Sequence, residues 1–360
     1  IRWEAAKHTC APMADTCSSR SSFLHILESA LNELYNGHCF LNTNTPSSNR
    51  LIPSGADLKV VYVSGLFLVD ELRPGYNAAA AGIKKGMQIA AVNDVPISEA
   101  IRKFLPKGVT SPGNSMIEYA ANMVLAGTHD KPRVITMETG LDRTNFYPDA
   151  LPNKTEIAAT GLLEARKLEG NTGYIRILNS LGNDELIRAF DEALDSLLNT
   201  TGMILDLRET PGGGTTTVAR AIMGRFIDKE MPYQKHIYTD EEKETGIRRS
   251  TLELVSPRGK TYRHPLVVLV SYWTASMGEG MAIGFDAMKR AVIAGTPMAG
   301  LLGEISTFET PELKVPFSFP TVQLQTVSGK PREDFRPSVI INDPDQALPA
   351  ALGLLKKKTP

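Results

Sequence analysis

The chain has 360 residues, of which 42% are hydrophobic and 22% charged, a composition typical of soluble globular proteins and unlike that of disordered or collagen-like chains. Its formal net charge of −1 argues against binding to a nucleic-acid backbone, which requires a basic surface. No apolar run approaches the ~18 residues that suggest a membrane span, and the length predicts two or three domains.

The sequence begins with Ile1 rather than methionine, so we expect a processed or trimmed form. Its three cysteines, Cys10, Cys17 and Cys39, all lie within the first forty residues. Three cysteines are too few for a disulfide framework. A Cys10–Cys17 bridge and three unpaired thiols both remain open.

Residues 1–57 are expected to form an N-terminal helical segment. Apolar residues recur every three or four positions between residues 20 and 36, which predicts an amphipathic helix. Asn36-Gly37 is a helix stop signal, and His38 follows it directly. Residues 41–57 are rich in Asn, Ser, Pro and Thr, which predicts a loop.

Residues 58–138 are expected to form a small β-rich module. Residues 58–69 read as two short strands around a turn, 73–82 as a turn and a short helix, and 86–97 as a strand, turn and strand. This order resembles a PDZ domain. The resemblance implies that one turn binds a peptide carboxylate; its residues are Gly65, Leu66, Phe67 and Leu68.

Residues 139–360 are expected to form an α/β core, preceded by a linker or irregular hairpin at 139–158. Predicted strands and helices alternate, which implies βαβ units on a largely parallel sheet. The strands are expected at 173–178, 202–207, 266–271 and 291–295, and the helices at 185–198, 216–226 and 274–288.

Two turns at the carboxyl ends of predicted strands are candidate sites, because ligands bind at this edge of open α/β sheets. The first contains Pro211-Gly-Gly-Gly214, which could be a phosphate loop or a tight turn, but it lacks the Gly-Lys-Ser/Thr ending of a nucleotide loop. The second contains Ser276, where a strand stops and a helix begins. Ser276 is either a helix N-cap or a nucleophile beside the backbone amide of Met277.

Together, these segments resemble the C-terminal-processing (tail-specific) serine peptidases and their tricorn-like relatives along nearly the whole chain. The matching motifs are Tyr174-Ile-Arg-Ile, Leu205-Asp-Leu-Arg followed by Pro211-Gly-Gly, Leu266-Val-Val-Leu-Val, Thr274-Ala-Ser-Met-Gly-Glu279, Arg290-Ala-Val-Ile-Ala-Gly295 and Arg336-Pro-Ser-Val. The resemblance implies a ClpP/crotonase-like α/β core with an N-terminal helical segment and an inserted PDZ domain.

The resemblance also implies a set of catalytic residues. The family nucleophile falls on Ser276, but the lysine of the Ser-Lys branch falls on Leu301, which cannot act as a base. Lys289 is expected to be a charged residue at a helix end. The tricorn-like branch uses a histidine base and a glutamate that orients it, and these roles fall on His38 and Glu333.

Several assignments within this set stay open. Asp334 adjoins Glu333, and Glu304 is a weaker candidate for the same role. The other histidines, His8, His25, His129, His236 and His264, lack the placement of the family base. For the oxyanion hole, the amides of Gly212 and Met277 are the first candidates and that of Gly213 is the next.

The sequence therefore predicts a serine endopeptidase that cleaves unfolded or tail-presenting proteins and peptides through an acyl-enzyme. The alternative is a non-catalytic peptide- or ligand-binding scaffold on the same fold. No metal-ligand cluster or nucleotide motif is visible, so we expect no cofactor and no metal. The expected partner is a protein or peptide substrate, with no nucleic acid and no membrane span, and a homo-oligomer stays open. The family is typical of the cell envelope, periplasm or secretion, which predicts an extracytoplasmic location.

Overall fold

A computed structural model describes residues 3–107, 109–150 and 161–357. The chain divides into two compact units: residues 1–158 with 305–320, and residues 159–304 with 321–360. Residues 305–320, which the sequence assigned to the peptidase core, thus belong to the first unit. Residues 151–158 of the expected linker lie outside the described residues.

The first unit begins with two helices, α1 (Trp3–Thr16) and α2 (Arg20–Asn32). Helix α1 was not predicted, because it buries only Ala6 and Cys10 and contains Pro12, so it carries little apolar periodicity. Helix α2 starts after Ser19, whose side chain accepts a hydrogen bond from the Ser22 N–H. It ends four residues before the expected position. All three cysteines are free thiols.

The rest of the first unit is built around a sheet with the order β2-β3-β4-β6-β7, in which β5 also pairs with β4. Strands β6 and β7 form a hairpin over 135–146, so the sheet extends beyond residue 138, where the module was expected to end. Helix α5 buries its C-terminal half against the sheet core. The bounds are β2 (Leu58–Val63), β3 (Leu66–Leu72), α3 (Asn77–Ala80), β4 (Gln88–Val92), β5 (Val95–Pro96), α4 (Ile97–Ala100), η1 (Ile101–Phe104), α5 (Asn114–Ala126), β6 (Ile135–Thr139), β7 (Asp142–Phe146) and η2 (Pro148–Ala150).

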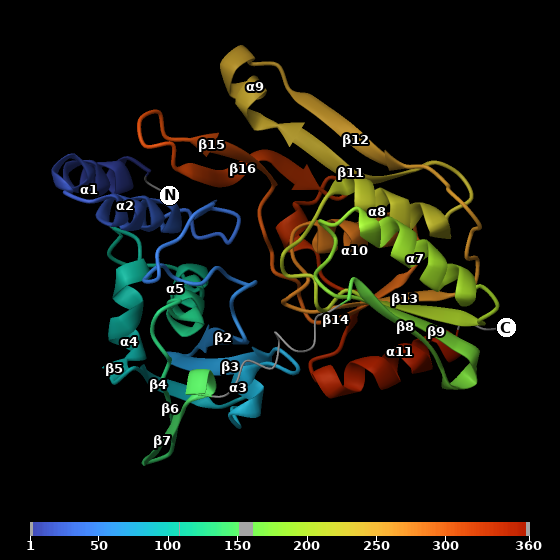
Figure 1. The fold of residues 1–360 in the computed structure, drawn as a ribbon, viewed down its shortest axis with the longest axis horizontal. Helices are drawn as coiled ribbons and strands as arrows, with labels where there is room; N and C mark the ends of the chain where they lie inside the picture. Colours follow the sequence, from blue (N-terminus) through green and yellow to red (C-terminus); the bar gives the residue numbers. More distant parts are fainter. Residues whose placement is uncertain (1–2, 108, 151–160, 358–360) are drawn as a thin grey trace. The chain divides into compact units, whose positions relative to one another are not determined.

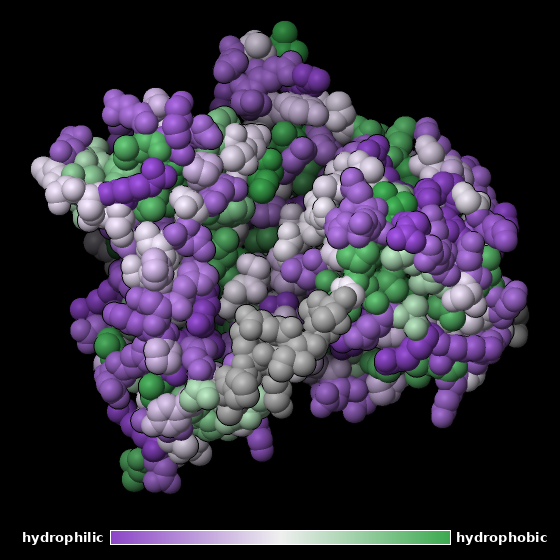
Figure 2. All heavy atoms as spheres, viewed as in Figure 1, coloured by the Kyte–Doolittle hydropathy of each residue, from purple (hydrophilic) through white to green (hydrophobic). Residues whose placement is uncertain are grey.

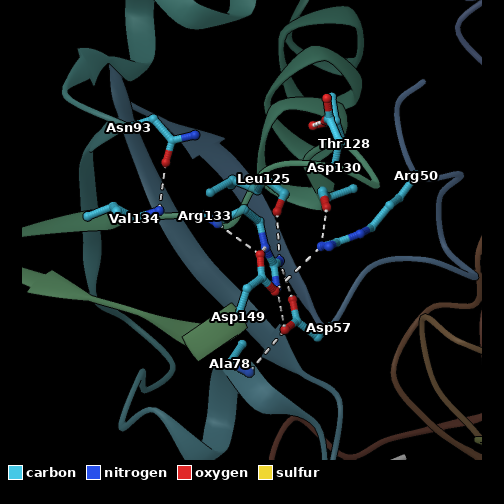
Figure 3. Close-up of polar contacts among 11 residues, drawn as sticks. Arg50, Asp57, Ala78, Asn93, Leu125, Thr128, Asp130, Arg133, Val134 and Asp149 are labelled. Carbon is cyan, nitrogen blue, oxygen red and sulfur yellow. Dashed lines mark hydrogen bonds and ion pairs between the residues drawn. The ribbon is translucent and has the colours of Figure 1, made fainter. Parts of the chain in front are cut away.

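A buried arginine ties these elements together (Figure 3). Arg133, only 4% exposed, donates two hydrogen bonds to the Asp57 carboxylate at 2.7 and 2.9 Å. Its side chain donates two more to Asp149, at 2.9 and 2.7 Å, and one to the Leu125 carbonyl at 2.9 Å. All five guanidinium N–H groups therefore have acceptors, which offsets the cost of burying the charge.

The second unit contains a six-stranded sheet with the order β17-β14-β13-β10-β9-β8. Strand β8 is antiparallel to β9, while the other neighbouring strands are parallel. Helices α7, α8 and α10 cover one face and α11 covers the other (Figure 1). The bounds are β8 (Leu163–Leu168), η3 (Glu169–Asn171), β9 (Thr172–Ile177), α7 (Glu185–Ser196), β10 (Gly202–Asp206), α8 (Thr216–Met223), η4 (Gly224–Phe226), β13 (Leu266–Val270), α10 (Met277–Ala287), β14 (Val292–Gly295), η5 (Arg332–Asp334), β17 (Val339–Ile340), η6 (Pro344–Gln346) and α11 (Ala347–Lys356).

This part of the fold follows the predicted alternation of strands and helices closely. Every residue of β13 is buried, with Leu266, Val268 and Val270 packed on one face and Val267 and Leu269 on the other. A strand that is covered on both faces reads as a continuous apolar run, which is why the sequence located it.

A further set of strands was not predicted. Strands β11 (Met231–Tyr238) and β12 (Arg249–Val255) form a hairpin that carries α9 (Thr239–Thr245). Strand β16 (Pro316–Gln325) crosses the unit boundary: its start pairs with β1 (Phe40–Leu41) in the first unit, and its end pairs with β11 in the second. Strand β15 (Glu304–Glu309) pairs with β16. Their partly exposed faces give no clean apolar alternation.

Within the described ranges, no helix is long and apolar enough to cross a membrane. On the face seen in Figure 2, hydrophilic side chains predominate on both units, with apolar side chains interspersed among them.

The Arg133 network predicts a large stability loss for Asp57→Asn. Asp57→Asn removes one of the two carboxylates that pair with buried Arg133, and loss of a partner of a buried ion pair costs about 3–5 kcal/mol. Glu138→Gln is the matched control, because its partner Arg143 is 65% exposed and such pairs contribute about 1 kcal/mol or less. Hydrogen exchange of peptides from β2 and α5 measures both changes. Equal protection in the two variants would contradict a stabilising role for the network.

Candidate active site

Ser276 lies between the end of β13 and the first residue of α10. From Tyr272 to Phe285 it is the only residue that is not buried. Its side chain is therefore presented at the carboxyl edge of the parallel sheet, while its neighbours on both sides are packed into the core. This placement matches what a nucleophile needs, since the hydroxyl must be accessible and held by a rigid scaffold.

The Ser276 backbone adopts an unusual conformation, with φ +53° and ψ −113°. A side chain with a Cβ atom rarely adopts positive φ, and such strain costs on the order of 1–3 kcal/mol. Two buried side chains hold it in place. The Ser276 N–H donates to the Glu279 carboxylate at 2.8 Å, and the Ser276 carbonyl accepts from Arg332 at 3.3 Å.

Glu279 and Arg332 also join the loop after β14 to this site. Glu279 accepts the N–H groups of Gly300 and Leu301 at 2.9 and 3.3 Å, and Arg332 donates to the Leu301 carbonyl at 2.6 Å. The two charges are 4.0 Å apart, with side-chain exposures of 1% and 3%. Burial raises the pKa of the Glu279 carboxyl, while Arg332 and the backbone N–H groups act in the opposite direction. The pair therefore fixes the two loops on either side of Ser276.

Gly213 lies directly against Ser276, with φ +64°. A Cβ atom at Gly213 would come within 2.5 Å of the Ser276 Cβ and 2.8 Å of its Oγ. The close approach requires glycine, and the positive φ favours it. The glycine-rich loop thus places its backbone next to the Ser276 hydroxyl. It lacks the sequence motif of a nucleotide-binding loop.

The three expected oxyanion-hole amides differ in their partners. The Gly212 N–H donates to the Asn179 side chain at 2.6 Å, and the Gly213 N–H donates to the Thr210 carbonyl at 3.2 Å. For the Met277 N–H, no hydrogen bond is recorded among the described residues. That N–H lies 3.3 Å from the position of a Cβ at Gly213, so it is near the Ser276 hydroxyl. Met277 is therefore the best placed of the three.

Glu333 belongs to η5 and directly follows Arg332, the residue that binds the Ser276 carbonyl. Helix α10 also contacts η5. The Glu333 side chain is partly buried, whereas Asp334 is exposed. Glu333 therefore lies near Ser276, because the preceding residue, Arg332, binds the Ser276 carbonyl. Its role as the orienting carboxylate stays a prediction.

His38 lies in the first unit, between α2 and β1, and is 5% exposed. Its backbone N–H donates to the Asn36 side chain at 3.0 Å, which fixes the short segment after the helix. Its role as the base stays a prediction.

The structure does not support a lysine as the catalytic base at either position that the sequence analysis considered. Leu301 is buried and has no ionisable group. Lys289 is exposed beyond the end of α10, which at 1.5 Å per residue is roughly 20 Å from Ser276.

His236, which the sequence analysis set aside, lies in the second unit between two carboxylates. Its ring nitrogens are 3.1 Å from Glu253 and 3.2 Å from Glu304. Burial lowers the pKa of His236, but hydrogen bonds to Glu253 and Glu304 outweigh this and raise it to about 9. The imidazole is thus already protonated at neutral pH and is unsuited to accept a proton from a serine. Glu304 is engaged in the same cluster.

The expected carboxylate-binding turn is a tight hairpin in the structure. Ser64 and Gly65, with φ +51° and +86°, close a two-residue hairpin between β2 and β3. Leu66 and Leu68 pair with Val63 and Val61, and Phe67 pairs with Tyr62. The role of Gly65–Leu68 in binding a peptide carboxylate stays a prediction.

No group of three or more His, Cys, Asp or Glu side chains in the described part of the chain is arranged to hold a metal ion. Sequence reasoning missed the Glu279–Arg332 pair. The Ser-x-x-Glu spacing of residues 276–279 is a signal that could have located Glu279. Arg332 carries no such signal.

Residues 171–330 match the family described as peptidase family S41. Three similar solved structures are mature CPAF complexed with lactacystin, the photosystem II D1 C-terminal processing protease and a putative peptidase from Parabacteroides merdae. Mature CPAF is 14% identical, with a TM-score of 0.61 over 98% of this chain and 90% of that chain. The D1 protease is 16% identical, with a TM-score of 0.54 over 97% and 95%. The Parabacteroides protein is 13% identical, with a TM-score of 0.53 over 99% and 89%. At these identities, the similarity shows a common fold.

The contact between Gly213 and Ser276 predicts that Gly213→Ala abolishes serine reactivity. The new Cβ would collide with Ser276, whereas Gly246→Ala is a matched control with φ +74° and nothing within 4 Å. Both variants carry left-handed strain of about 1 kcal/mol. Peptidase activity at equal folded concentration should fall at least ~100-fold in Gly213→Ala only. A similar activity in both variants would show that the close approach is unimportant.

Proposed function

We propose that Ser276 is the nucleophile of a serine peptidase, with His38 as its general base and Glu333 as the carboxylate that orients the imidazole, because residues 171–330 match peptidase family S41. The observation that carries the proposal is the placement of Ser276, the one accessible residue in a buried strand-to-helix junction. The family match favours catalysis over the non-catalytic scaffold that the sequence left open.

In the proposed reaction, the Ser276 hydroxyl attacks the scissile carbonyl as His38 takes its proton. The Met277 N–H stabilises the negative charge that develops on the carbonyl oxygen, and Gly213 keeps the neighbouring backbone close enough to contribute. The protonated His38 then donates its proton to the leaving amine. Water hydrolyses the acyl-enzyme by the same route in reverse.

The assignment of Glu333 is supported by its position next to Arg332. Because Arg332 is anchored on the Ser276 carbonyl, η5 keeps a fixed relation to the nucleophile. A carboxylate held there could fix the imidazole tautomer and stabilise its charged form. His38 is supported by its place after the N-terminal helix in the sequence pattern and by the exclusion of His236, Leu301 and Lys289.

We further propose that the second unit has a ClpP/crotonase-like core and that residues 58–138 form a PDZ-like module. The parallel sheet with helices on both faces supports the first, and the β2-β3-β4-β6 sheet packed against α5 supports the second. The substrates would be unfolded or tail-presenting proteins. An extracytoplasmic location is proposed from the sequence resemblance.

A cavity of about 270 Å³ in the first unit supports recognition of a chain end. Arg50, Arg73 and Arg133 line it, together with Asp57 and Asp149. Because Asp57, Asp149 and the Leu125 carbonyl accept all five Arg133 N–H groups, a ligand carboxylate would bind through Arg50. We propose this cavity, in addition to the Gly65–Leu68 turn, as a site for chain ends.

The nucleophile assignment predicts that Ser276→Ala abolishes hydrolysis of casein, while its Tm stays within a few degrees of the wild-type Tm. The hydroxyl is needed for the covalent step, whereas its removal leaves the backbone contacts to Glu279 and Arg332 intact. Ser196→Ala, an exposed serine on α7, is the control and should retain full turnover. Retained casein hydrolysis in purified Ser276→Ala would refute the assignment.

The base assignment predicts that His38→Ala lowers kcat by about 10³-fold or more, as expected for loss of a triad member. Glu333→Gln should lower kcat less, because the base remains but is less well oriented. His8→Ala, on the exposed side of α1, is the control. Near-normal kcat/KM in His38→Ala would rule out this base.

Recognition of a chain end predicts that amidating the C-terminus of a peptide substrate raises its Kd by roughly tenfold or more. Loss of a charge-assisted hydrogen bond costs about 1.5–3 kcal/mol. Calorimetry on Ser276→Ala separates binding from cleavage. Arg50→Met should weaken binding of the acid form and leave the amide form unaffected. Equal Kd values for the acid and the amide would show that the first unit does not bind chain ends.

A further inference from the structure

Three side chains of the first unit form a hydrogen-bonded chain that the proposed peptidase site does not use. His25 Nε2 lies 3.0 Å from the Ser47 hydroxyl, and His25 Nδ1 lies 3.1 Å from the Glu28 carboxylate. His25 and Glu28 lie one helical turn apart on α2, so they face the same side. Ser47 comes from the loop between β1 and β2.

This order of groups is that of a nucleophile, a base and an orienting carboxylate. A carboxylate can accept but not donate, so Glu28 fixes the proton on Nδ1 and leaves the Nε2 lone pair facing the Ser47 O–H. Thr45 offers a second hydroxyl at the longer distance of 3.4 Å from Nε2. It also contacts Ser47 and Ser48 at 3.2 and 3.1 Å, which limits the positions the loop hydroxyls can take.

The same three residues line a cavity of about 230 Å³. Leu31, Phe104, Met123 and Lys103 are among the other residues that line it. Ser47 is exposed and His25 is 38% exposed, so a small molecule can reach both. Burial and the nearby Lys131 lower the pKa of Lys103.

We propose that Ser47 is a second acylatable serine, with His25 as its base and Glu28 as the carboxylate that orients the imidazole, acting on small esters with an apolar acyl group. Ser47 Oγ forms a bond to the ester carbonyl carbon as its proton passes to His25 Nε2. The C–O bond to the leaving group breaks, and the alkoxide takes the proton from His25. Water then attacks the acyl-serine by the reverse proton path and releases the carboxylic acid.

The volume of the cavity limits the substrate class. It lies below the ~300–1,000 Å³ typical of pockets for drug-sized ligands, so it suits a short acyl chain rather than a polypeptide. An ester also has a better leaving group than an amide, which suits a serine that is less rigidly held than Ser276. The proposal is independent of the peptidase mechanism, because none of its residues takes part there.

The test uses the full chain carrying Ser276→Ala, with p-nitrophenyl butyrate as the probe. This background should still release p-nitrophenol above the uncatalysed rate and carry one butyryl group on the peptide that contains Ser47. Adding Ser47→Ala or His25→Ala should lower that rate by at least about 100-fold, in line with loss of a nucleophile or general base. Adding Glu28→Gln should lower the rate by a smaller factor and weaken its rise with pH.

Ser22→Ala is the matched control, because Ser22 is an exposed serine of the same helix that contacts only a hydroxyl, that of Ser19, at 2.8 Å. It should leave the rate and the butyryl position unchanged. The proposal is overturned if Ser276→Ala takes up no butyryl group, if the group maps to a peptide other than that of Ser47, or if Ser47→Ala retains the rate. Loss of activity in Ser276→Ala towards casein is a separate result and does not bear on this site.

Discussion

The buried ion pair of Glu279 and Arg332 is the interaction on which the arrangement around Ser276 depends. Two opposite charges, each with almost no exposure, lie 4.0 Å apart, and both also form hydrogen bonds with backbone groups. Glu279 accepts from Ser276, Gly300 and Leu301. Arg332 donates to the carbonyls of Ser276, Leu301 and Gly303. Because each charge is compensated mainly by the other and by these loops, neither loop can shift without exposing an unpaired charge.

This constraint explains how a strained residue persists at the sheet edge. Positive φ at Ser276 is unfavourable, but its N–H and carbonyl are held from opposite sides by rigid partners. Gly213 completes the arrangement, since only glycine allows the neighbouring loop to approach the Ser276 side chain so closely. Together, the backbone conformation of Ser276, the ion pair and Gly213 keep the Ser276 hydroxyl accessible and fixed beside a backbone N–H.

Sequence reasoning located those parts of the fold in which local pattern and burial agree. The strands β9, β10, β13 and β14 are apolar runs or alternations between helices, and they lie within a residue or two of the expected positions. Helix α1 and strands β11, β12 and β16 were missed because their faces mix exposed and buried positions without a clear period. Residues 305–320 were assigned to the core although they belong to the first unit. Their place there depends on pairing between β16 and β1, and such long-range pairing leaves no signal in the local sequence.

The site shows the same division. Ser276 and the glycine loop were recognisable because their chemistry is local to one turn each. The partners that hold them were not, because Glu279 and Arg332 are 53 residues apart in the sequence and meet only in the folded chain. The role of the Gly65–Leu68 turn stays a prediction, because a glycine followed by apolar residues is typical of a tight hairpin as well as of an anion-binding turn. Likewise, the charge on His236 depends on Glu253 and Glu304, which come close to it only in the folded chain.

The most direct measurement of the central claim is the site at which a fluorophosphonate modifies the native protein, mapped by peptide mass spectrometry. The account predicts an adduct on Ser276, because this hydroxyl is accessible and its backbone is fixed by Glu279 and Arg332. The adduct should be lost when the protein is unfolded in denaturant before labelling. A protein that digests casein but carries no adduct on Ser276 would contradict the account.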